Sequence, residues 1–313
     1  MSEGQRISTY FARTDTPETS DNVNAPRGSD WSARGFYDFR NRLWQVGGGV
    51  TRVGPNFNPE VGFLPRSNFI RPEMRIFFQP QPKRPKWIRR VAPHISANAF
   101  YDATEVRQGQ GRKLQTAFWH VHPFEIQPMQ GGRFGWFFDV NKDNPIRPFQ
   151  VYNRDGKRVV IPVGEYTWTQ HAFEYFYNPS APVTGTARVR VGEYYNGDFN
   201  AVELTSDFRF TARITASVGW TRQDISLPQG SFVANLVPVK TTISFTNLAS
   251  LSLLAQYNGQ TGQYSTNARL ALLDRSGTGL FVVYNDRRDV LDSTSYDTVG
   301  RSLVIKYTRL FDF

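Results

Sequence analysis

Apolar and polar residues alternate at every second position along much of this chain. The purest case is SDFRFTARITASVGWTR, in which every second residue from Phe208 to Trp220 is apolar and every residue between them is polar or Gly. A period of two is typical of a β-strand with two different faces, because successive side chains point to opposite sides of a sheet. At about 3.3 Å per residue and a tilt of about 40°, residues 208–220 rise roughly 33 Å. The pattern predicts one strand long enough to cross the apolar core of a bilayer.

The same alternation, less pure, predicts further strands along the chain, whereas helix-period segments and capping boxes ahead of apolar runs are absent. The predicted strands number about fourteen, at 6–13, 44–51, 66–79, 94–101, 112–126, 132–139, 165–177, 187–192, 208–220, 231–246, 250–257, 264–272, 279–285 and 301–313. Dipeptides that favour tight turns follow several of them, at Gln110-Gly111, Asp155-Gly156, Asn196-Gly197, Asn258-Gly259 and Ser276-Gly277. The sequence predicts an all-β meander forming a single domain, residues 1–313.

Aromatic residues are numerous for a chain of such low mean hydropathy. There are 25 Phe, 14 Tyr and 7 Trp, yet the mean hydropathy is −0.47 and no stretch approaches the roughly 18 apolar residues of a membrane helix. Small apolar residues with aromatics at the strand ends suit a lipid-facing wall. We therefore expect an antiparallel up-and-down transmembrane β-barrel of about fourteen strands. Two alternatives stay open: a soluble sandwich or barrel with its apolar faces inward, and a barrel that this length of chain does not close.

The chain is strongly basic, with 37 Lys and Arg against 27 Asp and Glu, and 30 of the cations are Arg. Basicity can indicate a nucleic-acid partner. The Arg residues are spread along the whole chain and no recognition motif is present, so we expect no such partner. Arginines that line a water-filled barrel lumen beside carboxylates explain the excess of Arg over Lys better than a nucleic-acid partner does. Strand parity makes these residues the lumen-facing candidates: Arg188, Arg190, Arg209, Arg213, Arg269 and Lys306.

The last segment, GRSLVIKYTRLFDF, ends on an aromatic residue and has apolar residues at most alternate positions before it. This pattern resembles the assembly signal of bacterial outer-membrane barrels, with Tyr307, Phe311 and Phe313 on the lipid face. Arg309 shares that face. Because it is close to the chain end it can reach the interface, where a cation costs about 0–1 kcal/mol rather than the roughly 2–4 kcal/mol of the midplane.

A wider resemblance rests on stretches in colinear order: FARTDTPE (11–18), NFNPEVGFLPR (56–66), VIPVGEYTW (160–168), GEYYNGDF (192–199), DISLPQGSF (224–232), SFTNLASLSLLAQYNGQTGQYSTNARL (244–270), GTGLFVVYND (277–286) and the last segment, 300–313. They resemble the C-terminal barrel region of the bacterial proteins grouped as the domain of unknown function 5916 family, which often carry a family 9 carbohydrate-binding domain ahead of the barrel. The resemblance implies a structural or transport-type barrel in the outer membrane of Gram-negative bacteria. The implied partners are the lipid bilayer, lipopolysaccharide and the outer-membrane barrel assembly machinery.

The resemblance also implies that this chain is the C-terminal part of a longer protein. Met1 is followed by SEGQRISTYFARTDTPETSDN, which has none of the regions of a signal peptide. The signal peptide, the carbohydrate-binding-like domain and the first strands of the family would then lie upstream, and a link to carbohydrate binding or uptake with them. The alternative from another class is a soluble all-β carbohydrate-binding or carbohydrate-processing protein.

Four histidines are the candidate metal ligands, because the chain has no cysteine. His120 and His122 lie at i and i+2 and so share a strand face, Glu125 has the other parity, and His94 and His171 stand alone. A metal needs three or more convergent ligands, so we expect two half-exposed imidazoles and no metal site. The carboxylates mark no pair for glycoside hydrolysis, and no nucleophile or phosphate-loop motif occurs. We therefore expect no catalytic residues and no cofactor.

The densest cluster of cations is PQPKRPKWIRR, residues 80–90. It is either a solvated hairpin turn with Trp87 as an interfacial anchor or a phosphate-binding rim for lipid headgroups or lipopolysaccharide. Counting strands back from a periplasmic C-terminus, we expect the polar segments 221–231, 257–264 and 285–300 to form longer outer loops. These loops are the best candidates for contact with a ligand.

Overall fold

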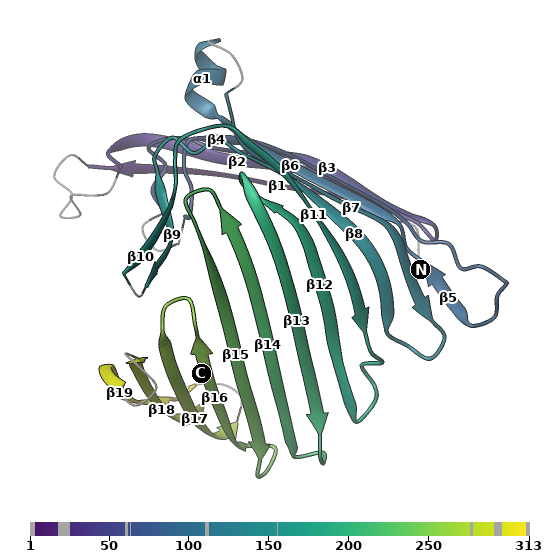
Figure 1. Ribbon diagram of the computed structural model, residues 1–313, viewed down its shortest axis with the longest axis vertical. Coiled ribbons are helices and arrows are strands. Elements are labelled where there is room, and N and C mark those ends of the chain that lie inside the picture. The colour runs from purple at the N-terminus through teal and green to yellow at the C-terminus, as the bar shows by residue number, and fades with distance from the viewer. Residues whose placement is uncertain are drawn as a thin grey trace. The chain divides into compact units, whose positions relative to one another are not determined.

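The computed structural model describes residues 4–17, 26–59, 62, 64–109, 113–154, 156–275, 278–290 and 296–310. The structure is all-β, with 73% of residues in strands and 2% in helix (Figure 1). Seventeen strands belong to one antiparallel sheet, and two more form a separate hairpin. Over the described residues the sheet is not closed. Within the same residues, no helix is both long enough and apolar enough to span a membrane.

The strands group into two compact units. The first unit, residues 1–129, 135–148 and 162–171, holds β1 (Gly4–Thr16), β2 (Gly28–Arg40), β3 (Trp44–Val53), β4 (Phe69–Phe78), β5 (Ile88–Val91), β6 (His94–Asp102), α1 (Ala103–Gln108) and β7 (Leu114–Pro128). The second unit holds β9 (Phe149–Arg154), β10 (Lys157–Ile161), β12 (Val183–Tyr194), β13 (Gly197–Arg209), β14 (Ile214–Leu227), β15 (Gly230–Ser244), β16 (Ala249–Asn258), β17 (Gln263–Arg275), β18 (Thr278–Val290) and β19 (Tyr296–Thr308). Two strands, β8 (Arg133–Asp143) and β11 (Tyr166–Phe176), contribute residues to both units.

Neighbouring strands pair antiparallel within each unit. In the first, β1, β2, β3, β4, β6 and β7 follow one another, and β5 pairs with β7. In the second, β12 to β19 pair in sequence order. The predicted all-β antiparallel architecture is confirmed, but the count of about fourteen strands was too low. Strands β2, β5, β9 and β10 were missed, because β2 carries Phe36 among its polar positions and the other three have only four to six residues.

The segment predicted as one long strand, 208–220, is instead the end of β13, a turn and the start of β14. Strand β13 ends at Arg209 and β14 begins at Ile214. The backbone N–H groups of Arg213 and Ile214 donate to the Thr211 hydroxyl oxygen, each at 3.1 Å. A threonine hydroxyl can close a turn in this way. Because neither Gly nor Pro marks the position, the alternation continues through the turn without a visible break.

Of the three segments expected as long outer loops, 221–231 and the described part of 285–300 consist mostly of strand, and 257–264 is half strand and half turn. The turn between β14 and β15 has two residues, 228–229, and the turn between β16 and β17 has four, 259–262. Strand β18 continues to Val290, and residues 291–295 lie outside the described residues. In 221–224 and 285–289 polar residues occupy both faces, so the alternation that marks a strand is lost there.

Pairing divides the strands of the second unit into an apolar face and a polar face, because directly opposed residues point to the same side of a sheet. One row across β14 to β19 consists of branched aliphatic residues: Ile214, Ile243, Leu251, Leu270, Val282 and Ile305. The adjacent row on the other face reads Thr215, Thr242, Ser252, Arg269, Val283 and Val304, and is polar from β14 to β17. The two-faced strands expected from the alternation are therefore present in this unit.

The first unit has the same division. One row reads Ile7, Tyr37, Gly48, Met74, Ala97 and Trp119 across β1, β2, β3, β4, β6 and β7. The adjacent row on the opposite face reads Arg6, Asp38, Gly47, Arg75, Ser96 and His120. Ion pairs cross this polar face, from Arg75 to Asp38 at 2.9 Å and from Arg34 to Glu73 at 2.7 Å.

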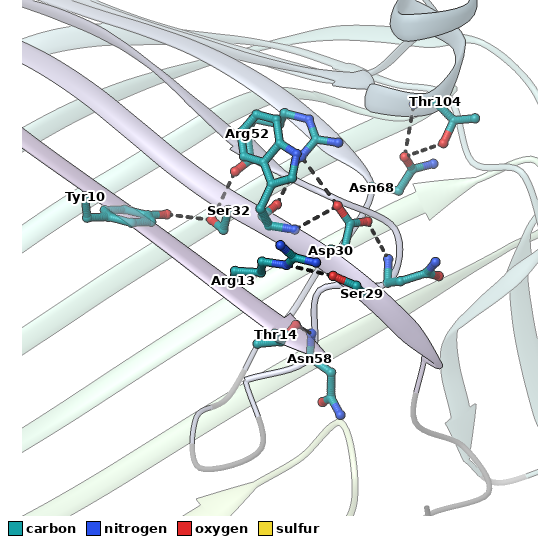
Figure 2. Close-up of polar contacts among 12 residues, drawn as sticks. Tyr10, Arg13, Thr14, Ser29, Asp30, Ser32, Arg52, Asn58, Asn68 and Thr104 are labelled. Carbon is teal, nitrogen blue, oxygen red and sulfur yellow. Dashed lines mark hydrogen bonds and ion pairs between the residues drawn. The ribbon is translucent and has the colours of Figure 1, made fainter. Parts of the chain in front are cut away.

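The loop after β3 is tied to β1 and β2 by hydrogen bonds (Figure 2). Asp30 accepts the backbone N–H of Asn56 at 3.0 Å, and Thr14 accepts that of Asn58 at 3.0 Å. A Cβ on Gly54 would lie 2.0 Å from the Asp30 carboxylate, so only glycine leaves room for this contact. Phe57 then packs in a small core. The stretches 11–18 and 56–66, both part of the resemblance, thus meet in the fold.

A short helix, α1, links β6 to β7. Asp102 caps its first turn by accepting the backbone N–H groups of Thr104 and Glu105 at 2.9 and 3.0 Å. Gly109 ends it in the left-handed conformation at φ 68°. With six residues, the helix is too short to show a helical period in the sequence.

Candidate functional site

Two of the predicted lumen-facing arginines form an ion-pair network on the polar face of the second unit. Arg188 in β12 contacts Glu174 in β11 at 2.8 Å and Glu203 in β13 at 2.9 Å. Glu174 also contacts Arg133 at 2.9 Å, and Arg190 lies 3.9 Å from Glu203. These arginines share a face, as parity predicted. The two carboxylates balance much of the charge of these arginines, so this part of the face is polar rather than strongly cationic.

Cations without nearby acids lie farther along the same face. The pairings place Lys240 in β15, Arg269 in β17 and Lys306 in β19 on the side that carries Arg188. Arg269 lies over the Phe281 ring at 5.1 Å. On this face of the described parts of β15 to β19, the acidic residues are Asp289 and Asp297. They lie near the C-terminal end of β18 and the N-terminal end of β19. Lys240 was not among the sequence candidates, although its parity could have placed it there.

The two remaining arginine candidates lie at the turn between β13 and β14. Arg209, the last residue of β13, donates to the Pro179 carbonyl. Arg213 lies in the turn itself and is exposed. Its assignment to a lumen-facing strand position was wrong, because that assignment needed 208–220 to be one continuous strand.

A two-stranded hairpin, β9–β10, packs on the polar face of the second unit. Val159 and Ile161 in β10 are fully buried, and Tyr152 in β9 stacks on Phe232 of β15 at 4.7 Å. Arg154 anchors the hairpin tip by donating to the Gly259 carbonyl at 2.8 Å. Apolar residues of β13 to β15 are buried at this end of the same face: Phe199, Ala201, Ile225, Leu227, Phe232 and Ala234. The hairpin therefore covers an apolar part of a face that is mostly polar elsewhere.

The aromatic residues expected to form an assembly signal are described only in part. Tyr307 in β19 lies on the apolar face beside Ile305, and both side chains are about two-thirds exposed, at 64% and 65%. Phe311 and Phe313 lie outside the described residues.

The basic stretch 80–90 connects β4 to β6 and contains β5. Its cations are exposed up to Lys86, and Trp87 is half exposed. Arg89 donates to Gln127 at 3.0 Å and Arg90 to Gln79 at 3.0 Å. Arg89 and Arg90 therefore tie this stretch to neighbouring residues, and its other cations face solvent.

Three histidines come together on the polar face of the first unit. His94 in β6 is paired with His122 in β7. His120 lies two residues before His122 in β7 and points to the same side of the sheet. One ring nitrogen from each lies within 4.8 Å of the others. The ring centroids are 4.6 Å apart for His94 and His122, and 5.2 Å apart for His94 and His120. We call these three residues the histidine cluster.

Carboxylates and aromatic rings surround the histidine cluster. Asp139 in β8 lies 2.7 Å from His120 Nδ1. The Glu125 carboxylate lies 3.8 Å from His122 Nδ1 and 3.9 Å from His94 Nδ1. His122, Glu125 and Asp139 are all buried. Phe77 stacks on the His94 ring at 4.4 Å, and the Phe137 centroid lies 4.9 Å from that of His120.

The expectation that His94 stands alone was wrong, and so was that of two half-exposed imidazoles, because His122 is only 3% exposed. A signal was present in the sequence. The predicted strands 94–101 and 112–126 are consecutive, and an antiparallel hairpin centred near residue 108 opposes position 94 to position 122. His171, in contrast, stacks on Trp136 at 5.9 Å and is not part of the cluster.

The geometry defines the class of protein: an all-β chain whose strands carry one apolar and one polar face. A comparison with protein-family models gives no match for this chain, and a comparison with curated proteins gives none either. The resemblance based on residues 11–18, 56–66 and the later stretches therefore stays a prediction.

Proposed function

We propose that the chain forms the wall of a bacterial outer-membrane β-barrel of a structural or transport type. Its apolar face would contact lipid. Its polar face would line a water-filled passage for anionic or polyhydroxylated solutes.

One observation carries the proposal: the apolar face of the second unit is extensive and uncovered. Across β12 to β19 many of its aliphatic side chains are exposed, with Val189 at 45%, Leu204 at 42% and Leu253 at 39%, and others, such as Leu251 and Leu270, are partly exposed. Monomeric soluble proteins rarely expose continuous apolar patches larger than a few hundred Å². A bilayer is the solvent that makes such a face favourable.

The position of the aromatic residues supports the same orientation. Trp220, Tyr257 and Tyr264 follow the apolar face toward one end of the strands, and Phe208 and Phe245 lie at the other end. From Val237 in β15 to Phe245, the residue after its end, the apolar positions extend roughly 20 Å for a strand tilted by about 40°. This height is close to the roughly 25 Å apolar band of outer-membrane barrels, and aromatic girdles flank that band in such proteins.

The polar face supports a passage with a preference for anions. Lys240, Arg269 and Lys306 share a part of the face that carries no acid among its described residues. The β9–β10 hairpin lies on the same face and would narrow the passage at one end. The resemblance adds lipopolysaccharide and the barrel assembly machinery as partners, and an upstream carbohydrate-binding domain as the source of a link to carbohydrate.

Reconstitution of the purified full chain tests the proposal. Urea-unfolded protein is diluted into phosphatidylcholine vesicles and into vesicle-free buffer, and folding is followed by tryptophan fluorescence and by protection from protease. The proposal expects a protected state only with vesicles, and ion conductance after transfer to a planar bilayer. In a salt gradient, the reversal potential should show anions passing more readily than cations.

A monodisperse folded state in detergent-free buffer would overturn the proposal. Retention of that soluble protein on a polysaccharide matrix would then favour the alternative, a soluble carbohydrate-binding protein. Vesicle-dependent folding without conductance would retain the wall and exclude the passage.

A further inference from the structure

We propose that the histidine cluster, His94, His120 and His122, binds a divalent transition-metal ion, with Zn²⁺ as the representative. This site is independent of the proposed transport function, because all three residues belong to the first unit.

The first argument is geometric. Zn²⁺ binds imidazole nitrogen at about 2.0–2.1 Å in tetrahedral sites, which places ligand nitrogens about 3.4 Å apart. In the cluster, one nitrogen from each ring already lies within 4.8 Å of the others. Closing the widest pair needs a shift of about 1.4 Å, which small rotations about χ1 and χ2 supply without moving the strands.

The second argument comes from the groups behind two of the rings. His120 Nδ1 lies 2.7 Å from Asp139 Oδ1, and His94 Nδ1 lies 2.9 Å from the Ala92 carbonyl oxygen. Both acceptors favour the tautomer with hydrogen on Nδ1, which leaves Nε2 with a lone pair for a metal. A carboxylate or carbonyl behind a histidine is the usual arrangement at zinc sites, where it fixes the ring and raises its basicity.

The third argument is the desolvated surroundings of His122. A Cβ on Gly135 would lie 2.4 Å from His122 Nε2, so the ring occupies space that only glycine at position 135 provides. Glu125 lies behind the same ring and is 6% exposed. A buried carboxylate is favourable beside a cation. A metal dication would supply that charge at this place.

The donor set determines the metal class. Three imidazoles suit Zn²⁺, Cu²⁺, Ni²⁺ or Co²⁺ rather than Ca²⁺ or Mg²⁺, which prefer oxygen ligands. Three protein nitrogens leave one position of a tetrahedron for water, for Glu125 or for a small ligand. Metal binding by a chain with Glu125 replaced would show whether its carboxylate, rather than water or a small ligand, fills this fourth position.

The test is metal titration of the full chain, metal-stripped and held in detergent micelles or in buffer according to its solubility. Co²⁺ is the first probe, because its visible absorption reports coordination number and nitrogen ligation. Zn²⁺ is added second, in competition. We expect one Co²⁺ per chain, a spectrum of four-coordinate type and its loss when one equivalent of Zn²⁺ is added.

The variants separate a built site from adventitious binding. His120→Ala and His122→Ala should abolish stoichiometric binding, and Asp139→Asn should weaken it by about 10- to 100-fold. His171→Ala is the matched control and should bind as the wild type does. Gly135→Ala should weaken binding by displacing His122, whereas Gly35→Ala in β2, where an added Cβ would meet no atom within 4 Å, should not.

The proposal is overturned if the wild-type chain binds no Zn²⁺ at micromolar metal, a result that does not depend on whether any variant folds. It is also overturned if His171→Ala loses as much affinity as His122→Ala. Circular dichroism of each variant shows whether lost binding reflects lost strand structure. If the alanine variants unfold, Asp139→Asn with retained strand structure and unchanged affinity still contradicts the proposal.

Discussion

Replacing Leu253 with arginine tests which solvent the apolar face of the second unit meets. Leu253 lies in the middle of β16 on that face and is 39% exposed. From Leu253 to Tyr257 the chain rises roughly 10 Å along the membrane normal, at about 3.3 Å per residue and a tilt of about 40°. An arginine at this depth cannot bring its whole side chain to the interface. It should cost about 2–4 kcal/mol in a bilayer.

Leu254→Arg is the matched control, because the same substitution one residue along β16 falls on the polar face. Leu254 is 37% exposed and is opposed by Lys240. A like charge directly opposite costs roughly 0.2–1 kcal/mol. Leu253→Arg should therefore be the more destabilising variant by at least about 1 kcal/mol, or roughly fivefold in the folding equilibrium.

The assay is a urea titration of reversible folding into short-chain phosphatidylcholine vesicles, followed by tryptophan fluorescence. In water, an exposed Leu→Arg change usually alters stability by less than about 0.5 kcal/mol. Equal costs for the two variants would refute the assignment of the Leu253 face to lipid. A larger cost for Leu254→Arg would reverse the two faces.

Three further changes follow from the contacts of each unit. Glu203→Gln removes one carboxylate from Arg188, so the reversal potential of the reconstituted chain in a salt gradient should move toward stronger anion preference. Ile161→Ala empties a fully buried position in β10 of the hairpin and should cost about 2–5 kcal/mol in urea unfolding; a change below about 1 kcal/mol would show that the hairpin does not pack on the sheet. Gly54→Ala should lower the unfolding midpoint clearly more than Gly35→Ala, because its Cβ would meet Asp30 at 2.0 Å.

Much of the strand content could be predicted because burial on one face imposes a period of two. Where the predicted strands differ from the observed ones, the difference has a physical cause. Between Arg209 and Ile214 the alternation passes through a turn closed by the Thr211 hydroxyl, so periodicity alone joined two strands into one. At the far end of β14 the apolar residues change face, with Ile225 and Leu227 on the polar side and Arg222, Asp224 and Ser226 on the other, so the period changes phase although the strand continues.

The histidine cluster shows a different limit. Parity places His120 and His122 on one face from the sequence alone, but His94 joins them only through the register of β6 and β7. Register depends on where the connection turns, and this connection contains the helix α1 rather than a short hairpin turn. A metal site assembled from neighbouring strands therefore needs the pairing before its third ligand can be recognised.

The high proportion of arginine has a structural explanation in these two polar faces. A guanidinium can bond two carboxylates at once, as Arg188 does with Glu174 and Glu203 from the strands on either side. It can also lie over an aromatic ring, as Arg269 does over Phe281 at 5.1 Å. Lysine keeps the charge but loses the planar fork. Arg188→Lys should therefore destabilise the chain although the net charge is unchanged, and Arg222→Lys, on an exposed pair with Asp224, should have a much smaller effect. This difference would attribute the arginine bias to bridging between strands rather than to charge.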